Sequence, residues 1–200
     1  YNQTKEVGIK PTPSIGGVGL IKNYKTMVTM DFKEVNNLVM IIGKTDGHID
    51  QSLFARTILD EKNGPPPEVN LFNEKNNGES LLNLIEKGYI KSAHDVSLGG
   101  IITAISKMSI KGNKGIKIKK SKDLMNDIEY FFAEDQGRYI VEINQKDLKE
   151  VSKILDKNSV HHEKLGVIVD KELIINEKTK VTIDELKAYN TNWLTNYMSS

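Results

Sequence analysis

The chain has 200 residues, of which 38% are hydrophobic and 28% are charged, and its net charge is +1. This balance predicts a folded domain with a sizeable core and argues against a strongly basic nucleic-acid binder. The sequence has no cysteine, which excludes disulfide frameworks, thiolate catalysis and cysteine metal sites. No apolar run approaches the roughly 20 residues that a membrane span needs. The start also lacks the features of a signal peptide, so we expect a cytoplasmic protein.

The first 36 residues contain several prolines and glycines and have the pattern of extended structure. Pro11 and Pro13 suit an edge strand because proline fixes φ and lacks a backbone donor. The segment 15–21 (IGGVGLI) matches neither GxGxxG nor GK[ST]. We interpret it as a strand packed closely against a neighbour. We place a domain boundary between Asp31 and Asn36.

From residue 37 on, strand and helix patterns alternate. The run 37–43 (NLVMIIG) is apolar on both faces, which is typical of a strand covered on both sides. Further strands are expected at 89–95, 115–119, 139–143, 165–169 and 172–175. Helices are expected at 51–60, 73–87, 101–108, 123–130, 145–155 and from 182 onward, where Thr182 and Glu185 form a capping box. The interleaving predicts an α+β or α/β fold in which helices pack on a mixed sheet.

Two polar stretches carry weak functional signals. The lysines between Lys111 and Lys122 are followed at once by acidic residues, so we interpret the run as a solvated loop or edge strand. In the loop 43–52, Asp46, His48 and Asp50 could hold a metal. Without a further ligand, turn chemistry and helix capping explain them better.

The segment 92–100 (SAHDVSLGG) carries the strongest signal. A strand end delivers a histidine and an aspartate, and two glycines then lead into a helix, which is how open α/β sheets present ligands. The free N–H groups of a helix start favour an anion such as phosphate. The candidate ligand-binding residues are therefore His94, Asp95, Ser97, Gly99 and Gly100. Asp95 is also a candidate ligand of Mg²⁺, which takes one or two carboxylates beside phosphate and water. Alternatively, Asp95 or Ser97 merely caps the helix, and His94 satisfies a buried carbonyl.

The segment 131–139 (FFAEDQGRY) places an acidic and amide cluster before a strand. Glu134 and Gln136 are candidates to bind hydroxyl or amide groups, and Arg138 can pair with a carboxylate or phosphate through two hydrogen bonds. The alternative is a charged turn with an internal Arg–Glu ion pair. No serine lies in a recognisable nucleophile elbow. The residues alone therefore indicate an α/β domain with one anion-binding turn.

Several stretches resemble one known family. SAHDVSLGG is similar to the SAHDVSEGGL segment of phosphoribosylformylglycinamidine synthase, and residues 1–20 look like its YNET…PTP-IG-VGLI passage. Residues 132–138 (FAEDQGR) are similar to its F-(G/S)-E-S-Q-S-R segment. With 165–168 and 182–186, these matches cover nearly the whole chain in the family's order. The sequence departs from the family at Leu98, usually glutamate, at Asp135, usually serine, and at 50–52, usually Gly-Gly-Ser.

This resemblance implies an ATP-dependent carbon–nitrogen ligase of purine biosynthesis. In that family, ATP and Mg²⁺ activate formylglycinamide ribonucleotide, and ammonia derived from glutamine displaces the activated oxygen. The family repeats a pair of domains, an ATP-binding N-type domain and a C-type α/β domain. The resemblance implies that residues 1–36 are the tail of an N-type domain. Residues 37–200 would be the second C-type domain, similar to the C-terminal domain of aminoimidazole ribonucleotide synthetase.

The family's main catalytic residues are expected outside this chain, so we expect no catalytic residue here and no activity of this stretch alone. The segments around His94–Asp95 and 134–136 resemble duplicated metal- and substrate-binding segments, which are either structural here or hold an auxiliary nucleotide. The implied partners are the remaining domains of the enzyme, a glutamine amidotransferase subunit and a small carrier subunit. The alternatives are another related ATP-dependent synthetase, or a docking domain that exposes an apolar patch above roughly a few hundred Å².

Overall fold

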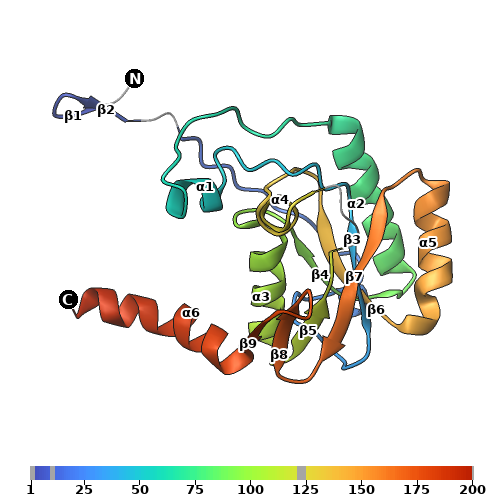
Figure 1. Cartoon of the computed structure of the whole chain (residues 1–200). Coiled ribbons are helices and arrows are strands. Elements are labelled where there is room, and N and C mark those ends of the chain that lie inside the picture. Colours follow the sequence, from blue (N-terminus) through green and yellow to red (C-terminus); the bar gives the residue numbers. More distant parts are fainter. Residues whose placement is uncertain (1–2, 10–11, 121–124, 200) are drawn as a thin grey trace.

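The structure, a computed structural model, describes residues 3–9, 12–120 and 125–199. A seven-stranded mixed sheet has the order β4-β6-β3-β7-β5-β8-β9 (Figure 1). Its strands are β3 (Leu38–Ile42), β4 (Ile90–Asp95), β5 (Gly115–Ile118), β6 (Tyr139–Ile143), β7 (His162–Val169), β8 (Glu172–Ile175) and β9 (Thr179–Thr182). Neighbouring strands are antiparallel except for β5 and β8, which are parallel. The predicted mixed sheet is confirmed.

Helices cover both faces of this sheet. The helices are α1 (Leu53–Thr57), α2 (Leu71–Glu86), α3 (Gly100–Gly112), α4 (Asp127–Phe132), α5 (Leu148–Lys157) and α6 (Ile183–Met198), with 3-10 turns at Tyr24–Thr26 and Gln145–Asp147. One core cluster joins the sheet to α3 and α4, and a second joins it to α2 and α5. None of the helices in the described ranges is long and apolar enough to cross a membrane.

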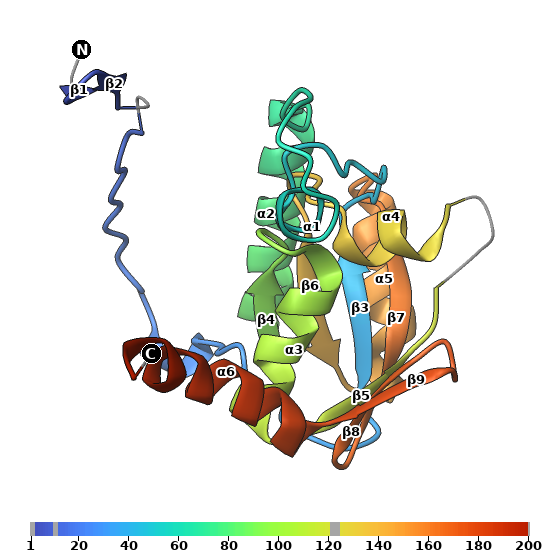
Figure 2. The same ribbon diagram turned by 60° about the vertical axis from the view of Figure 1, so that its left-hand side comes forward.

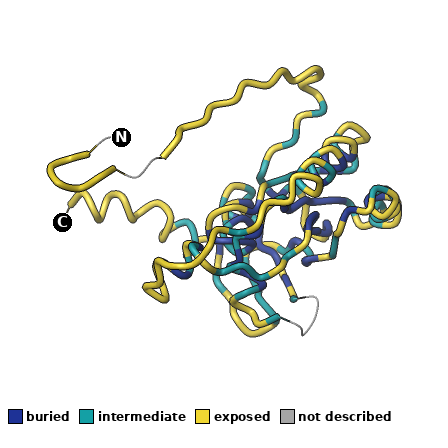
Figure 3. Tube along the Cα trace, turned by 90° about the horizontal axis from the view of Figure 1, so that it is seen from above, coloured by how far each residue is buried: buried dark blue, intermediate teal, exposed yellow. Residues whose placement is uncertain are grey.

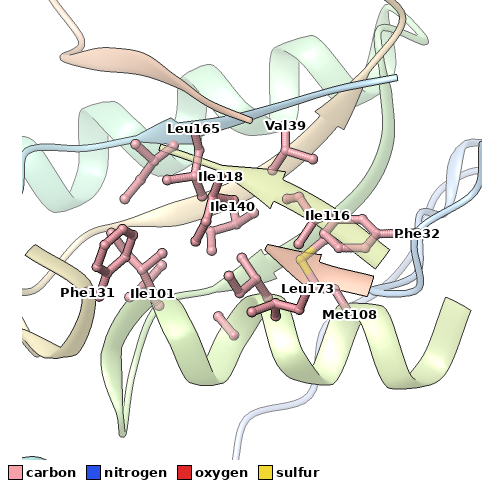
Figure 4. Packing of buried hydrophobic residues seen from close by; sticks show 14 of the residues in the cluster. Phe32, Val39, Ile101, Met108, Ile116, Ile118, Phe131, Ile140, Leu165 and Leu173 are labelled. Atoms are coloured by element: carbon pink, nitrogen blue, oxygen red, sulfur yellow. The ribbon is translucent and has the colours of Figure 1, made fainter. Parts of the chain in front are cut away.

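The central strand β3 shows why both layers form. All five of its residues are buried. Because side chains alternate along a strand, Val39 and Ile41 enter the α3 cluster while Leu38, Met40 and Ile42 enter the α2 cluster. Figure 4 shows the first cluster, in which a stripe of α3 packs against the sheet. Each fully buried aliphatic side chain of this kind contributes about 1.5–3 kcal/mol.

The first residues leave the body as an extended segment (Figure 3). A short hairpin pairs Gln3–Thr4 with Val7–Gly8, and Pro11 lies outside the described residues. Residues 15–21 are exposed and form no strand. The prediction that they pack closely against a neighbour is wrong for this structure: a Cβ added to Gly16, Gly17 or Gly19 would meet nothing within 4 Å. Such a strand needs a second layer, and the described residues place none there.

The chain already packs on the body within and just before the predicted boundary at 31–36. Phe32 is buried in the α3 cluster. The backbone N–H groups of Lys33 and Glu34 donate to the Glu142 carboxylate at 2.8 and 3.0 Å. Thr29 already bridges to Ser92 of β4. The segment 29–36 is therefore packed on the domain that follows it.

Most element boundaries agree with the sequence within a few residues. The capping box of Thr182 and Glu185 is confirmed. Helix α1 is shorter than expected, with Ser52 as its N-cap. Helix α4 begins only at Asp127, because Asn126 caps it, and the expected start at Asp123 lies outside the described residues. Strand β9 was not predicted.

The prediction that the lysine run forms an edge strand is wrong, because β5 is flanked by β7 and β8 and Lys111 lies in the last turn of α3. Lys117 and Lys119 lie on the exposed face of β5 and after its end. Lys117 pairs with Glu177 at 2.8 Å, and Lys120 pairs with Asp127 at 3.1 Å. Two lysines of the described part of the run are thus paired with acidic side chains of the same chain.

Candidate functional site

Three polar segments that the sequence singled out meet at one edge of the sheet. Strand β6 runs antiparallel to both β3 and β4, so its start lies beside their ends. Tyr139 pairs with Ile42 of β3 on one side and with Asp95 of β4 on the other. The segments 43–52, 95–100 and 133–138 follow or precede these residues directly. We call these three segments together the rim.

Asp135 ties the first of these segments to the third. Its buried carboxylate accepts hydrogen bonds from the backbone N–H groups of Asp46, Gly47 and His48, each at 3.1 Å. In return, the carbonyl of His48 accepts from the backbone N–H of Glu134 at 3.0 Å. A carboxylate with several backbone donors is a strong acceptor site. The loop after β3 therefore wraps around a charge that the chain itself provides.

Arg138 holds the same segment from inside. Its side chain is buried, and it donates to the Asp135 carbonyl at 3.1 Å, the Thr45 hydroxyl at 3.0 Å and the Ala133 carbonyl at 2.7 Å. Burial lowers the pKa of the Arg138 guanidinium, and nearby Asp135 opposes this change. The expected internal Arg–Glu pair is corrected: the ion-pair partner of Arg138 is Asp135, at 3.7 Å. The Nε, Nη1 and Nη2 atoms of Arg138 thus each donate a hydrogen bond within the chain.

Glu134 joins the second segment to the rest of the rim. One carboxylate oxygen accepts from the backbone N–H of Gly99 at 2.8 Å and from that of Leu53 at 2.7 Å. Helix α3 has no side-chain cap of its own, so the alternative in which Asp95 or Ser97 caps it is wrong. An acidic side chain therefore already lies where the sequence suggests that a phosphate could bind.

The paired glycines are required by this turn. Gly99 and Gly100 have φ values of +80° and +68°, which L-residues with a Cβ adopt only with strain. A Cβ on Gly100 would lie 2.7 Å from the carbonyl oxygens of Ala133 and Phe131. The predicted path from a strand tip through two glycines into a buried helix is confirmed.

His94 and Asp95 lie on the outer side of the rim. The Nδ1 atom of His94 is 2.7 Å from the Asp95 carbonyl and 3.0 Å from its carboxylate. The side chain of Asp95 is 61% exposed. Met30, Ala93 and Tyr139 complete a shallow hollow of about 270 Å³ around this pair. Burial raises the pKa of the Tyr139 phenol, and the negative charges of Glu74 and Asp95 add to this shift.

On its other side, the rim borders a polar cavity of about 710 Å³. Its walls include Lys44, Asp46, His48, Asp50, Asn70, Asn73, Glu74, Asn77, Asp135 and Gln136. The contribution of α2 was missed, although its early turns carry several polar side chains on one face. Within the described residues, no three His, Asp or Glu side chains are gathered closely enough to hold a metal ion.

The predicted site residues divide into two groups. The side chains of Asp95, Ser97 and Gln136 are exposed, and His94, next to Asp95, is half-buried. In contrast, Glu134, Arg138 and the two glycines are used in contacts within the rim. The rim thus presents a small set of outward polar groups on an internally braced scaffold.

The comparisons with known proteins agree with this architecture. Residues 34–176 match the family model described as AIR synthase related protein, C-terminal domain. The chain is 67% identical over all 200 residues to the phosphoribosylformylglycinamidine synthase subunit PurL of Pelagibacter ubique. It spans only 27% of that relative's length.

Two solved structures from Thermotoga maritima share the fold. PurL complexed with ATP has a TM-score of 0.63 and 18% identity, over 82% of this chain and 27% of that one. The structure titled PurLQS has a TM-score of 0.63 and 20% identity, over 82% of this chain and 28% of that one. At these identities the likeness establishes the arrangement of helices and strands.

Proposed function

The chain belongs to the family of AIR synthase related proteins, through their C-terminal domain, and on this premise we propose that it is part of phosphoribosylformylglycinamidine synthase. Identity to that synthase's PurL subunit carries the proposal, because it extends over the whole chain at 67%. The matched region includes all three rim segments. Residues 1–36 would then be the tail of an N-type domain, and 37–200 a C-type domain packed beside it.

The proposed reaction of the whole enzyme forms the amidine of formylglycinamide ribonucleotide. ATP supplies the activation of the formamide oxygen, and ammonia drawn from glutamine takes its place. A relative solved as a complex with ATP supports a nucleotide in this reaction. Mg²⁺ is the expected counter-ion of the phosphates.

The rim is a poor cradle for phosphate in its present form. A phosphate site at a helix start requires free backbone N–H groups. Here the N–H of Gly99 donates to Glu134, and those of Asp46, Gly47 and His48 donate to Asp135. We therefore propose that this chain does not hold the reacting nucleotide and has no activity alone.

The outward residues are left with a contact role. Asp95 and Gln136 present a carboxylate and an amide at opposite sides of the start of β6. With His94 and Ser97, they are the proposed contacts toward a neighbouring domain or an auxiliary ligand. Glu134, Arg138, Gly99 and Gly100 fix the positions from which these contacts are made.

The proposed partners are the remaining domains of the same polypeptide, a glutamine amidotransferase subunit and a small subunit. The structure titled PurLQS supports an assembly of this kind for the relatives. The rim offers polar and charged groups to such partners.

The test is an assay of the full polypeptide that contains this chain. Purified enzyme is given formylglycinamide ribonucleotide, ammonia, ATP and Mg²⁺, and both amidine formation and ADP release are measured. We expect equal amounts of the two products. The 200-residue stretch, assayed in parallel, should form neither.

A folded full polypeptide that releases no ADP with this substrate, but does so with the substrate of a related synthetase, would overturn the assignment. Activity of the 200-residue stretch alone would overturn the proposal that the reacting nucleotide lies elsewhere. Thermal unfolding of each sample serves as the control for folding.

A further inference from the structure

Helix α6 packs on the described body through its first turns. Ile183 is buried, and Leu186 packs on the α3 cluster. Lys187 Nζ donates to the Asn113 side chain at the end of α3, at 2.6 Å. Beyond this point the helix projects away from the sheet (Figures 1 and 2). Residues 188–199 are all exposed.

The face that packs on the body continues along the projecting part. Ile183, Leu186, Asn190, Trp193 and Tyr197 follow one another at alternating steps of three and four residues. Side chains with this spacing lie on one face of a helix. We call these five residues the seam; Leu194 lies beside it. The first two are covered by the body, whereas Trp193 is 66% and Leu194 57% exposed.

The projecting part has the composition of an interface. Residues 188–199 (AYNTNWLTNYMS) contain no charged side chain but carry two tyrosines, a tryptophan and two further large apolar residues. Interface cores are depleted in charge and enriched in aromatic residues and methionine. The rings of Trp193 and Tyr197 stack at 5.6 Å with an interplanar angle of 11°. A hollow of about 340 Å³ opens beside Trp193, lined by Ala188, Tyr189, Asn192 and Asn196.

The spacing of the seam indicates what kind of element covers it. Alternating steps of three and four residues are the pattern that packs against another helix. The opposite face carries small polar residues, among them Thr191 and Thr195. One side of α6 is therefore suited to a helix and the other to solvent. The first seam residues pack on the body near the end of α3. A helix that covers the rest of the seam must therefore also lie next to the end of α3.

We propose that a helix of the remaining polypeptide of the same enzyme covers this seam; the proposal rests on the proposed function. The two exposed rings offer about 300–500 Å² to a partner, against about 800 Å² per partner in a stable interface between separate chains. A second copy would therefore be held weakly. A tethered segment binds at an effective concentration in the millimolar range, so a small seam suffices.

A second apolar segment supports this occupant. Residues 15–21 are exposed as well, and in Figures 1, 2 and 3 they and α6 leave the body on the same side. The chain spans 27% of the length of its relative from Pelagibacter ubique. A neighbouring domain of the same polypeptide on that side would cover both surfaces.

Amide hydrogen exchange of the full polypeptide tests the proposal. We expect residues 188–198 to exchange slowly and independently of protein concentration, with the particle mass unchanged by dilution. The residues that contribute most to an interface are enriched in tryptophan, and a tenfold change in an equilibrium corresponds to about 1.4 kcal/mol. Trp193→Ser should therefore accelerate exchange in this helix about tenfold. Thr195→Ser on the opposite face is the matched control and should change little, while Trp193→Phe should restore most of the protection.

Three results would overturn the proposal. One is fast exchange of 188–198 in the unaltered full polypeptide. Another is protection that appears only with a doubling of mass at high concentration, which assigns the seam to a second copy. The third is equal acceleration by Trp193→Ser and Thr195→Ser. Because exchange is measured without substrate, failure here is distinct from failure of the amidine assay.

Discussion

Strand β6 has a carboxylate-centred network at each end, and the two networks differ in their surroundings. Near its second end, Glu142 is fully buried and accepts from Lys33, Glu34, Asn37 and Ser92 at 2.7–3.0 Å. Before its first end, Asp135 accepts from three backbone N–H groups of the rim. The Glu142 network is enclosed by the sheet and the incoming chain. The rim opens onto a hollow and a polar cavity.

The difference shows how one kind of bond serves two purposes. Both carboxylates fix a loop by accepting N–H groups that would otherwise lack partners. At Glu142 every neighbour belongs to the folded body, so the network attaches the segment 29–37 to the sheet. At the rim the same bracing leaves Asp95 and Gln136 facing outward. Replacing each carboxylate by its amide should therefore have a cost that falls with exposure.

Glu142→Gln is the strongest test of this comparison. Glutamine retains one acceptor oxygen but presents an NH₂ group to two of the four donors. Because hydrogen bonds to a charged group contribute about 1.5–3 kcal/mol each, we expect a loss of about 3 kcal/mol. Urea unfolding at neutral pH measures it, with exposed Glu86→Gln on α2 as the control. A loss below about 1 kcal/mol would show that the interior network is dispensable.

Asp135→Asn should be the second most costly change. The amide keeps an acceptor for some of the N–H groups of 46–48 but removes the charge beside buried Arg138. We expect a loss of about 2 kcal/mol, with faster amide exchange confined to 43–52. A loss equal to that of Glu142→Gln would erase the proposed difference between rim and interior.

The sequence indicated the rim residues but not the Glu142 network, and this difference has a physical reason. The rim lies in loops, where polar residues break an apolar pattern, so His94, Asp95 and Glu134 were identifiable. Glu142 lies inside an apolar strand (YIVEI) and looks like a solvent-facing position. Its donors are 50 to 109 residues away in the chain. No local pattern indicates such partners.

The layers of the fold were more predictable than its contacts. The continuous apolar run of β3 and the stripes of α2, α3 and α5 each encode a burial pattern within a few residues. The pairing order of the sheet is not encoded locally, and neither is the role of Asp135 as an acceptor. The prediction that segment 15–21 is packed against a neighbour was wrong because apolar residues indicate burial but do not indicate which part of the protein covers them.

Glu134→Gln should have a smaller effect, which separates charge from geometry at the rim. A single oxygen of Glu134 accepts both N–H groups, and glutamine retains such an oxygen. We expect a loss below about 1 kcal/mol for Glu134→Gln and about 2 kcal/mol for Glu134→Ala, which leaves the Gly99 N–H without its acceptor. Comparing the two urea midpoints measures the difference. Equal losses would mean that the charge itself holds the turn of α3.

Asp31 provides the smallest step, because its carboxylate lies at the surface of the same incoming segment that Glu142 holds. Hydrogen bonds from Lys33 and Thr29 lower the pKa of Asp31 from 3.8 to about 2. A lowered pKa stabilises the fold above pH 3.8, and this contribution is lost as the pH falls toward 2. The side chains of Lys33 and Asp31 are 36% and 31% exposed, so solvent screens this ion pair. We expect it to contribute less than about 1 kcal/mol to the free energy of unfolding. The difference in unfolding free energy between the native chain and Asp31→Asn should therefore become smaller as the pH is lowered from 5 to 3. A difference that stays constant over this range would place the stabilisation in packing, and the gradation from interior to surface would then not follow charge.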